Sequence, residues 1–238
     1  MRTKIEWVRN FDGTQGYTIN PVKGLCPVAC PYCYARRMYK RFKWNPEIRF
    51  DPIVLADPFC YPKPSTIFVG STIELFGDWI KPAWTEMILE FCQRETNKRH
   101  TYIFLTKQPQ DLPREFPENC WVGVTATNEH FAAVGLGNLK SVDAKVKFLS
   151  IEPLLHWLDA NFWARWFKDI NWLIIGQQTP VSAKTEPKIE YIREIVEAAD
   201  KAGIPVFLKE NLVPLIAGKG TPEGLFYEDC RLRQEMPK

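Results

Sequence analysis

The sequence predicts an α/β protein whose core is a sheet of parallel strands. Short apolar runs rich in Val, Ile, Phe and Thr alternate along the chain with longer stretches of helical periodicity. The chain has 238 residues, of which 45% are hydrophobic, and this is enough to bury one substantial core. We therefore expect a single domain over residues 1–238, with its core at about 15–215 and a short C-terminal extension.

Seven strands are expected from the apolar runs: Tyr17–Asn20, Thr66–Ser71, Tyr102–Thr106, Trp121–Ala126, Val146–Ile151, Trp172–Gly176 and Pro205–Leu208. Most of these runs are apolar throughout and do not alternate between polar and apolar residues. That pattern is typical of strands buried on both faces, as in a parallel sheet.

Five helices are expected in the remaining stretches: Ala35–Phe42, Pro82–Asn97, Asn128–Leu136, Asp159–Lys168 and Lys188–Ala202. The second starts with a proline in its first turn, and the fifth ends before Gly203 in a C-cap position. The alternation of strands and helices predicts repeated βα units with right-handed crossovers. Periodicity alone leaves two folds open, a complete or partial βα barrel and an open doubly wound sheet.

Three cysteines lie within eight residues in the pattern C-x3-C-x2-C: Cys26, Cys30 and Cys33. An aromatic residue, Tyr32, precedes the third cysteine. A structural zinc site or a closed iron–sulfur site needs four protein ligands, and this loop supplies three. Three thiolates can hold three irons of a cubane cluster and leave the fourth iron open to a substrate or cofactor.

Other interpretations of the cysteines remain open. The three could be half of a zinc site completed by Cys60, Cys120 or a histidine, although the chain has no second C-x2-C pair. Burial of the thiols as core filler is disfavoured in a loop that contains Gly24, Pro27 and Pro31. Disulfides are disfavoured by the odd total of seven cysteines and by the lack of an export signal.

Basic residues concentrate near the N-terminus. Residues 1–50 hold ten Lys or Arg and three Asp or Glu, a net charge of +7, so residues 51–238 carry −4 of the total of +3. A basic cluster interleaved with aromatic residues follows the cysteines: Arg36, Arg37, Tyr39, Lys40, Arg41, Phe42, Lys43 and Trp44. Such a segment can contact phosphate backbones, or it can be a solvated helix face whose aromatic residues pack inward.

The N-terminus has no apolar signal-peptide core, and no apolar run approaches membrane-spanning length. We therefore expect a cytoplasmic protein with reduced thiols and no membrane partner.

Polar residues gather where the expected strands end: Ser71–Glu74, Thr106–Gln108, Thr125–Asn128, Ser150–Pro153, Gly176–Gln178 and Lys209–Asn211. Chemistry in α/β folds takes place at the carboxyl ends of parallel strands, so six such ends in succession predict a polar cavity.

Three charged residues at these strand ends are candidate catalytic groups that would face a substrate: Glu152, Lys107 and Lys209. A buried carboxylate stays charged only when it is paired, and a lysine is its natural partner. The alternative is a structural ion pair that ties strand ends together.

The cysteine loop resembles that of the radical S-adenosylmethionine (radical SAM) enzymes. Four motifs follow in order: Asn20-Pro21-Val22-x-Gly24-x-Cys26, Cys33-Tyr34-Ala35, Leu105-Thr106-Lys107 and Ser150-Ile151-Glu152-Pro153-Leu154. Together, over residues 5 to 215, they resemble a compact radical-SAM-like family of bacteriophages and mobile elements that has no single assigned reaction. The resemblance implies a partial (β/α)6 barrel with its cluster loop after the first strand. It also implies a [4Fe–4S] cluster on Cys26, Cys30 and Cys33 whose open iron binds S-adenosyl-L-methionine (SAM).

The resemblance further implies a set of SAM-binding residues: Tyr32, Gly70, Ser71, Thr72, Glu74, Thr125, Asn128, Ser150, Gly176 and Gln177. The turn at 70–72 would hold the SAM amino group, with the acid displaced by two residues from its usual place. The fourth and fifth strand ends would hold the ribose and the carboxylate. The sixth, which is usually glycine-rich, would lie against the adenine.

The activity implied by the resemblance is reductive cleavage of SAM, with an electron from a donor such as flavodoxin or ferredoxin, to a 5′-deoxyadenosyl radical. That radical would abstract hydrogen from a substrate, and a modified nucleobase, nucleotide or DNA in a phage modification pathway fits, for example in a radical rearrangement. Two other classes stay open. One is a non-catalytic metal- or cluster-stabilised nucleic-acid-binding protein, and the other is a degenerate radical SAM fold kept as an interaction protein.

Overall fold

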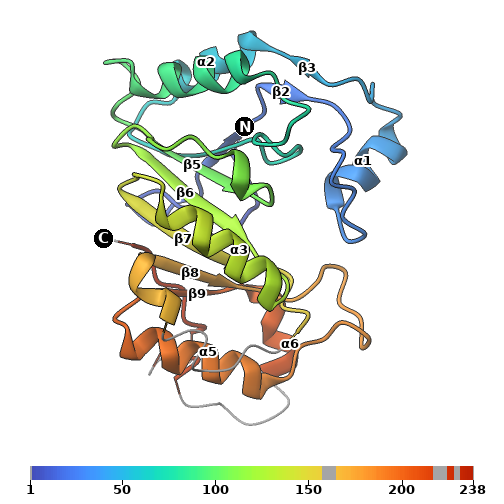
Figure 1. The fold of residues 1–238 in the computed structure, drawn as a ribbon, viewed down its shortest axis with the longest axis vertical. Helices are drawn as coiled ribbons and strands as arrows, with labels where there is room; N and C mark the ends of the chain where they lie inside the picture. The colour runs from blue at the N-terminus through green and yellow to red at the C-terminus, as the bar shows by residue number, and fades with distance from the viewer. Residues whose placement is uncertain (1, 157–164, 217–223, 228–230, 238) are drawn as a thin grey trace. The chain divides into compact units, whose positions relative to one another are not determined.

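The computed structural model describes residues 2–156, 165–216, 224–227 and 231–237 (Figure 1). The chain divides into two compact units, Met1–Val122 with Val142–Lys145 and Gly123–Ser141 with Val146–Lys238. The expectation of a single domain stays a prediction. No helix within the described residues combines the length and the apolar character needed to cross a membrane.

The protein is mixed α/β, as predicted, and all seven expected strands are present: β1 (Tyr17–Ile19), β4 (Thr66–Val69), β5 (Thr101–Thr106), β6 (Cys120–Thr125), β7 (Val146–Ile151), β8 (Trp172–Ile175) and β9 (Val206–Leu208). Their order is β1-β4-β5-β6-β7-β8-β9, and the described pairs β1–β4, β4–β5, β7–β8 and β8–β9 are parallel. A doubly wound sheet reverses its strand order at a switch point. This order has no reversal, so the doubly wound alternative is wrong.

In the first unit, the strands β1, β4 and β5 are joined by α1 (Tyr34–Phe42), by α2 (Pro82–Gln93) and by two elements that the sequence did not predict. One is a short antiparallel pair of β2 (Val22–Lys23) and β3 (Arg49–Phe50), and the other is the 3-10 helix η1 (Pro52–Cys60). A second 3-10 turn, η2 (Pro109–Asp111), follows β5. All four residues of β4 are buried, which agrees with a strand covered on both faces.

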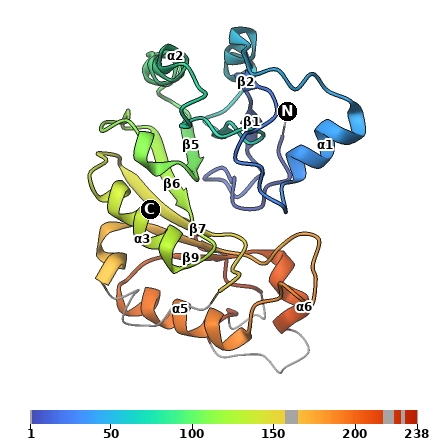
Figure 2. The same ribbon diagram turned by 45° about the vertical axis from the view of Figure 1, so that its right-hand side comes forward.

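In the second unit, α3 (Glu129–Lys140) packs on β7, and α5 (Ile189–Lys201) lies beside β8 and β9 in both ribbon views (Figures 1 and 2). The unit also holds η3 (Phe167–Asp169), η4 (Glu210–Leu212) and α6 (Val213–Ile216). Most of the expected helix Asp159–Lys168 lies outside the described residues. The fifth expected helix is confirmed, and Gly203 follows its C-cap with φ +70°.

The core of the second unit is built on aromatic rings from successive strands. The Phe148 ring lies 5.3 Å from that of Trp172, which lies 6.2 Å from that of Phe207, and all three are fully buried. A Cβ at Gly123 would come within 2.3 Å of the Phe148 ring. The glycine in β6 therefore makes room for the phenylalanine of β7.

Candidate functional site: a cysteine loop and polar strand ends

The three cysteines of the motif lie on the connection between β2 and α1, after the first strand of the sheet, as predicted. All three are half-buried free thiols. Cys33 is the N-cap of α1, and its sulfur accepts the backbone N–H of Arg36 at 3.4 Å. The Arg36 guanidinium donates to the carbonyl of Cys26 at 2.6 Å. Arg36 therefore holds both ends of the cysteine loop.

The start of the loop is fixed by contacts that the sequence does not reveal. The N–H of Gly24 donates to the Tyr39 hydroxyl at 2.7 Å, and the N–H of Leu25 donates to the Pro46 carbonyl at 2.9 Å. Ala29, between the first two cysteines, has φ +54°, a left-handed conformation that a residue with a Cβ adopts only at a cost. The loop is thus tied to α1 and holds a strained residue at its centre.

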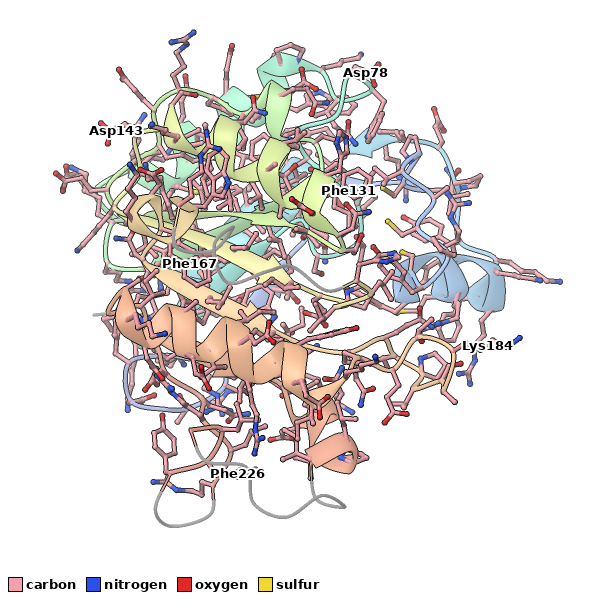
Figure 3. All side chains as sticks on the ribbon, turned by 60° about the horizontal axis from the view of Figure 1, so that its bottom comes forward. Asp78, Phe131, Asp143, Phe167, Lys184 and Phe226 are labelled. Atoms are coloured by element: carbon pink, nitrogen blue, oxygen red, sulfur yellow. The ribbon has the colours of Figure 1, made fainter. Side chains whose placement is uncertain are left out.

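Burial raises the pKa of the Cys26 thiol, and hydrogen bonds from the backbone N–H groups of Glu74 and Val28 oppose this shift. The Glu74 carboxylate and the Cys30 thiol contribute further to the rise. The sulfur of Cys26 therefore lies against the turn that follows β4. Figure 3 shows sulfur atoms beside the blue ribbon of α1.

Three free thiols lie on one loop, and their chemistry fits three of the four iron ligands of a cubane cluster. Among the described residues, no three His, Cys, Asp or Glu side chains are gathered as a ready-made metal site. A cluster would therefore draw the three sulfurs together.

The other cysteines and His100 belong to different surroundings. Cys92 and Cys120 are buried in the core, and burial, with a hydrogen bond that the Cys92 thiol donates to the Cys120 sulfur, raises the pKa of Cys92. Cys60 lies near the start of β1, because the ring of the next residue, Tyr61, stacks 3.8 Å from the ring of Tyr17. The cysteine loop follows the opposite end of that strand. His100 is buried and accepts the N–H of Ser65 at 3.2 Å. None of these contacts supports a fourth ligand to the loop.

The turn after β4 is held by Asn20, at the end of β1. Gly70 has φ +79°, and a Cβ on it would lie 2.4 Å from Leu75, so the position requires glycine. The side-chain oxygen of Asn20 accepts from the Ser71 hydroxyl at 3.2 Å and from the N–H and hydroxyl of Thr72 at 3.2 and 3.1 Å. The hydroxyl of Tyr34 in α1 donates to the Ser71 carbonyl at 2.6 Å. This helix therefore ties the cysteine loop to the turn proposed to bind SAM.

The carboxylate of Glu74 is buried, with 8% of the residue exposed, and its hydrogen-bonding capacity is used within the first unit. One oxygen accepts from the Thr106 hydroxyl at 2.6 Å and from the N–H of Phe76 at 3.2 Å, and the other accepts from the N–H of Lys107 at 2.8 Å. These bonds join the turn after β4 to the end of β5. They give Glu74 a structural role, and a contact of this acid with SAM stays a prediction.

In the second unit, Glu152 after β7 forms an ion pair with Lys209 after β9. The side chains are 28% and 14% exposed. The pair spans the end of β8, where a Cβ on Gly176 would come within 2.8 Å of the Lys209 side chain. Gly176 therefore lets the lysine cross to its partner. The sequence named these residues, but it did not show which lysine pairs with Glu152, and Lys107 belongs to the first unit.

Gln177 is held against Asn211 by a set of hydrogen bonds. The N–H of Gln177 donates to the Asn211 side-chain oxygen at 3.2 Å, and the Asn211 amide donates to the Gln177 carbonyl at 2.7 Å. The Gln177 side-chain amide donates in turn to the Asn211 carbonyl. The amide end of this side chain is thereby fixed, while its oxygen stays buried and has no hydrogen-bond partner among the described residues.

Two other residues predicted to bind SAM also have a buried side-chain oxygen without a hydrogen-bond partner. Thr125, at the end of β6, and Ser150, in β7, each have a buried hydroxyl oxygen with no partner in the part of the chain that the structure describes. The two strands are neighbours there, because the N–H of Ala126 donates to the Ser150 carbonyl at 3.0 Å. Buried polar groups in proteins are usually paired, so these oxygens leave hydrogen-bonding capacity for a polar ligand or water. Asn128 instead caps α3, with its side chain accepting the N–H of Phe131 at 3.0 Å.

Three residues that organise the site received no role from the sequence: Asn20, Arg36 and Asn211. Asn20 opens the first of the four ordered motifs, and Asn211 stands in the polar group after the last strand. Their positions at strand ends were the available signal. Arg36 was counted only as part of the basic cluster.

The fold and the site define the class: an α/β protein of consecutive parallel strands with a three-cysteine loop after the first of them. A family described as "Protein of unknown function (DUF5131)" matches residues 2–212, which is most of the chain, and the protein belongs to that family. The comparisons with curated proteins and with solved structures gave no match.

Proposed function

We propose that this protein is a radical SAM enzyme. The observation that carries the proposal is the loop of three free cysteines between the first parallel strand of the sheet and α1, with Cys33 at the helix N-terminus and Arg36 joined to both Cys26 and Cys33. When bound, a [4Fe–4S] cluster together with SAM would supply one-electron cleavage of the sulfonium and a 5′-deoxyadenosyl radical. The fold class that the resemblance implies, a partial (β/α)6 barrel, is part of this proposal.

The residues of the first unit would hold the cluster and the methionine end of SAM. Cys26, Cys30 and Cys33 supply the thiolates, and the helix N-terminus at Cys33 favours negative charge there. The turn from Gly70 to Thr72 is already fixed by Asn20 and Tyr34. Its backbone can therefore present carbonyls to an ammonium group with little reorganisation.

The second unit, taken by itself, offers buried polar groups and a charged pair that a ligand could contact. The oxygens of Thr125, Ser150 and Gln177 are buried and have no partner in the described residues, so a ligand hydroxyl or amino group would satisfy them. The pair of Glu152 and Lys209 offers a fixed charge of each sign for orienting a substrate. We propose a modified nucleobase, nucleotide or DNA as the substrate class, and a flavodoxin or ferredoxin as electron donor.

The test is an electron paramagnetic resonance spectrum of the anaerobically reconstituted and reduced protein, recorded with and without SAM. A cubane signal that shifts when SAM is added is expected, because SAM binding at an open iron changes the surroundings of the cluster. A protein that takes up no cluster, or a cluster whose spectrum does not respond to SAM, would refute the proposal. Tight, salt-dependent DNA binding by that cluster-free protein would then favour the non-catalytic nucleic-acid-binding alternative.

A further inference from the structure

An exposed group of aromatic and basic side chains lies at the C-terminal end of α1. We define the aromatic–basic face as Tyr39, Phe42 and Trp44 with Arg41 and Lys43. Phe42 and Trp44 are 52% and 43% exposed, although both are large apolar residues. Their rings are stacked, with centroids 5.5 Å apart and an interplanar angle of 22°.

The end of the helix fixes these rings in place. Lys43 has the left-handed conformation, φ 50° and ψ 40°, and the N–H of Trp44 donates to the Tyr39 carbonyl at 3.2 Å. This is the Schellman arrangement, which commonly brings the residue after the turn against the last helical turn. The Trp44 ring accordingly meets the Tyr39 ring edge-on at 5.3 Å. Because the backbone sets the position of Trp44, the stacked rings are ordered before any ligand binds.

The charges around the rings are positive. The Arg41 guanidinium lies 5.3 Å from the centroid of the Phe42 ring, and Lys40, Arg41 and Lys43 are exposed. Residues 34–49 contain six Lys or Arg and a single acid, Glu47. Glycine is the usual residue at the left-handed position after a helix, so Lys43 keeps a cation beside the rings where the backbone disfavours a side chain.

We propose that the aromatic–basic face binds single-stranded nucleic acid, with a base stacked on Phe42 or Trp44 and phosphates bound by Arg41 and Lys43. Exposed aromatic planes flanked by cations are how proteins bind unpaired strands without reading their sequence. An acidic protein partner would need the cations alone, whereas the ordered, exposed rings fit the flat face of a base. The helix α1 starts directly after Cys33, so a strand bound at its C-terminal end would be held by the same helix that begins at the proposed cluster loop. The inference rests on the proposed function for the suggestion that this strand is the substrate.

Binding is measured by fluorescence anisotropy with the full chain carrying its reconstituted cluster. The probe is a labelled oligothymidylate of about 12 nucleotides, within the span of about 4–16 that such surfaces cover. The variant Phe42→Leu/Trp44→Leu keeps apolar bulk and removes the π-faces. We expect it to raise Kd about tenfold or more. The variant Arg41→Gln/Lys43→Gln should lower the slope of log K against log salt by about 0.7 for each phosphate that the protein no longer neutralises.

Two controls keep the result specific. Phe11→Leu removes a 76% exposed aromatic residue elsewhere on the first unit, and Lys98→Gln removes an exposed lysine after α2. Both should leave Kd unchanged. A labelled hairpin duplex should bind more weakly than the oligothymidylate, because its bases are already stacked.

Three outcomes would overturn the proposal: no binding of oligothymidylate at low salt, equal binding by the leucine variant, or polyglutamate binding that depends on the same two rings. The last would assign the face to an acidic protein. The SAM-dependent resonance change is recorded on the same samples. If the unaltered protein shows the SAM-dependent change but does not bind the oligonucleotide, the aromatic–basic face is overturned and the proposed function stands. If it binds the oligonucleotide through the two rings but shows no SAM-dependent change, the proposed function is overturned and the face stands.

Discussion

The two units differ in how they treat the polar residues at their strand ends. In the first unit, Asn20, Ser71, Thr72 and Glu74 are hydrogen-bonded within the unit, and Glu74 accepts three bonds. In the second unit, Thr125, Ser150 and Gln177 each keep a buried oxygen without a partner among the described residues.

This difference separates scaffold from ligand site. A buried polar group without a hydrogen bond costs about 1–3 kcal/mol. Three such oxygens therefore lower the free energy of unfolding as long as no ligand binds them. At the strand ends of the first unit, the polar groups already satisfy each other. The buried polar atoms of that unit that have no partner among the described residues are the hydroxyls of Tyr61 and Tyr102 and the indole N–H of Trp79, none of which belongs to the loop of the three thiols that could bind a ligand. We therefore expect substitutions of Glu74 and Thr72 in the first unit to affect stability, and substitutions of the unpartnered groups in the second unit to affect ligand binding.

The largest effect is expected at the cysteine loop. Replacing Cys26, Cys30 or Cys33 by Ala should each abolish cluster uptake, because each removes one of three thiolate ligands. Cys92→Ala is the control, since that thiol is buried in the core of the same unit. Iron and sulfide content after anaerobic reconstitution measures the result. Equal loss in Cys60→Ala or Cys120→Ala would show a fourth ligand and a closed site.

The next effect concerns Glu74. Glu74→Ala should lower the free energy of unfolding by about 3 kcal/mol, because the buried Thr106 hydroxyl and the N–H groups of Phe76 and Lys107 lose their acceptor. Glu74→Gln keeps an acceptor and should lose less. Urea unfolding of the cluster-free protein measures both. An unchanged midpoint in the alanine variant would show that the first unit is no better satisfied than the second.

The strands were predictable from the sequence for a physical reason, and the site contacts were not. β6 and β7 are buried along almost their whole length, so the composition of each run is sufficient to identify it. β2 and β3 have two residues each and are far apart in the chain, so neither has a pattern of its own. The same limit applies to the site. The spacing of the cysteines is local in the sequence and can be recognised there. The contact of the Lys209 side chain with Gly176 involves two strands that lie side by side only in the folded protein.

A smaller effect compares ion pairs in the two units. Lys209→Met leaves Glu152 unpaired in surroundings where the lysine and glutamate side chains are 14% and 28% exposed. We expect it to lower the free energy of unfolding by about 1–3 kcal/mol, between the values typical of exposed and buried pairs. Adding Glu152→Gln should recover part of the loss.

The matched control is Lys23→Met in the first unit, where Lys23 and Asp51 are 38% and 27% exposed. Its cost should stay below about 1 kcal/mol. Equal costs for the two lysines would mean that the pair in the second unit is an ordinary surface ion pair.

The smallest effect on stability, and the sharpest test of the comparison, is expected at the unpartnered hydroxyls. Thr125→Val and Ser150→Ala remove oxygens that have no partner in the described residues, so each should leave the cluster-free protein unchanged or up to about 1 kcal/mol more stable. The same variants should weaken SAM binding, measured by isothermal titration of the reconstituted protein. Thr72→Val in the first unit should instead cost about 1 kcal/mol, because its hydroxyl donates to Asn20 at 3.1 Å. If the two hydroxyls of the second unit proved as important to stability as Thr72, bound water would already satisfy them, and the second unit would be scaffold like the first.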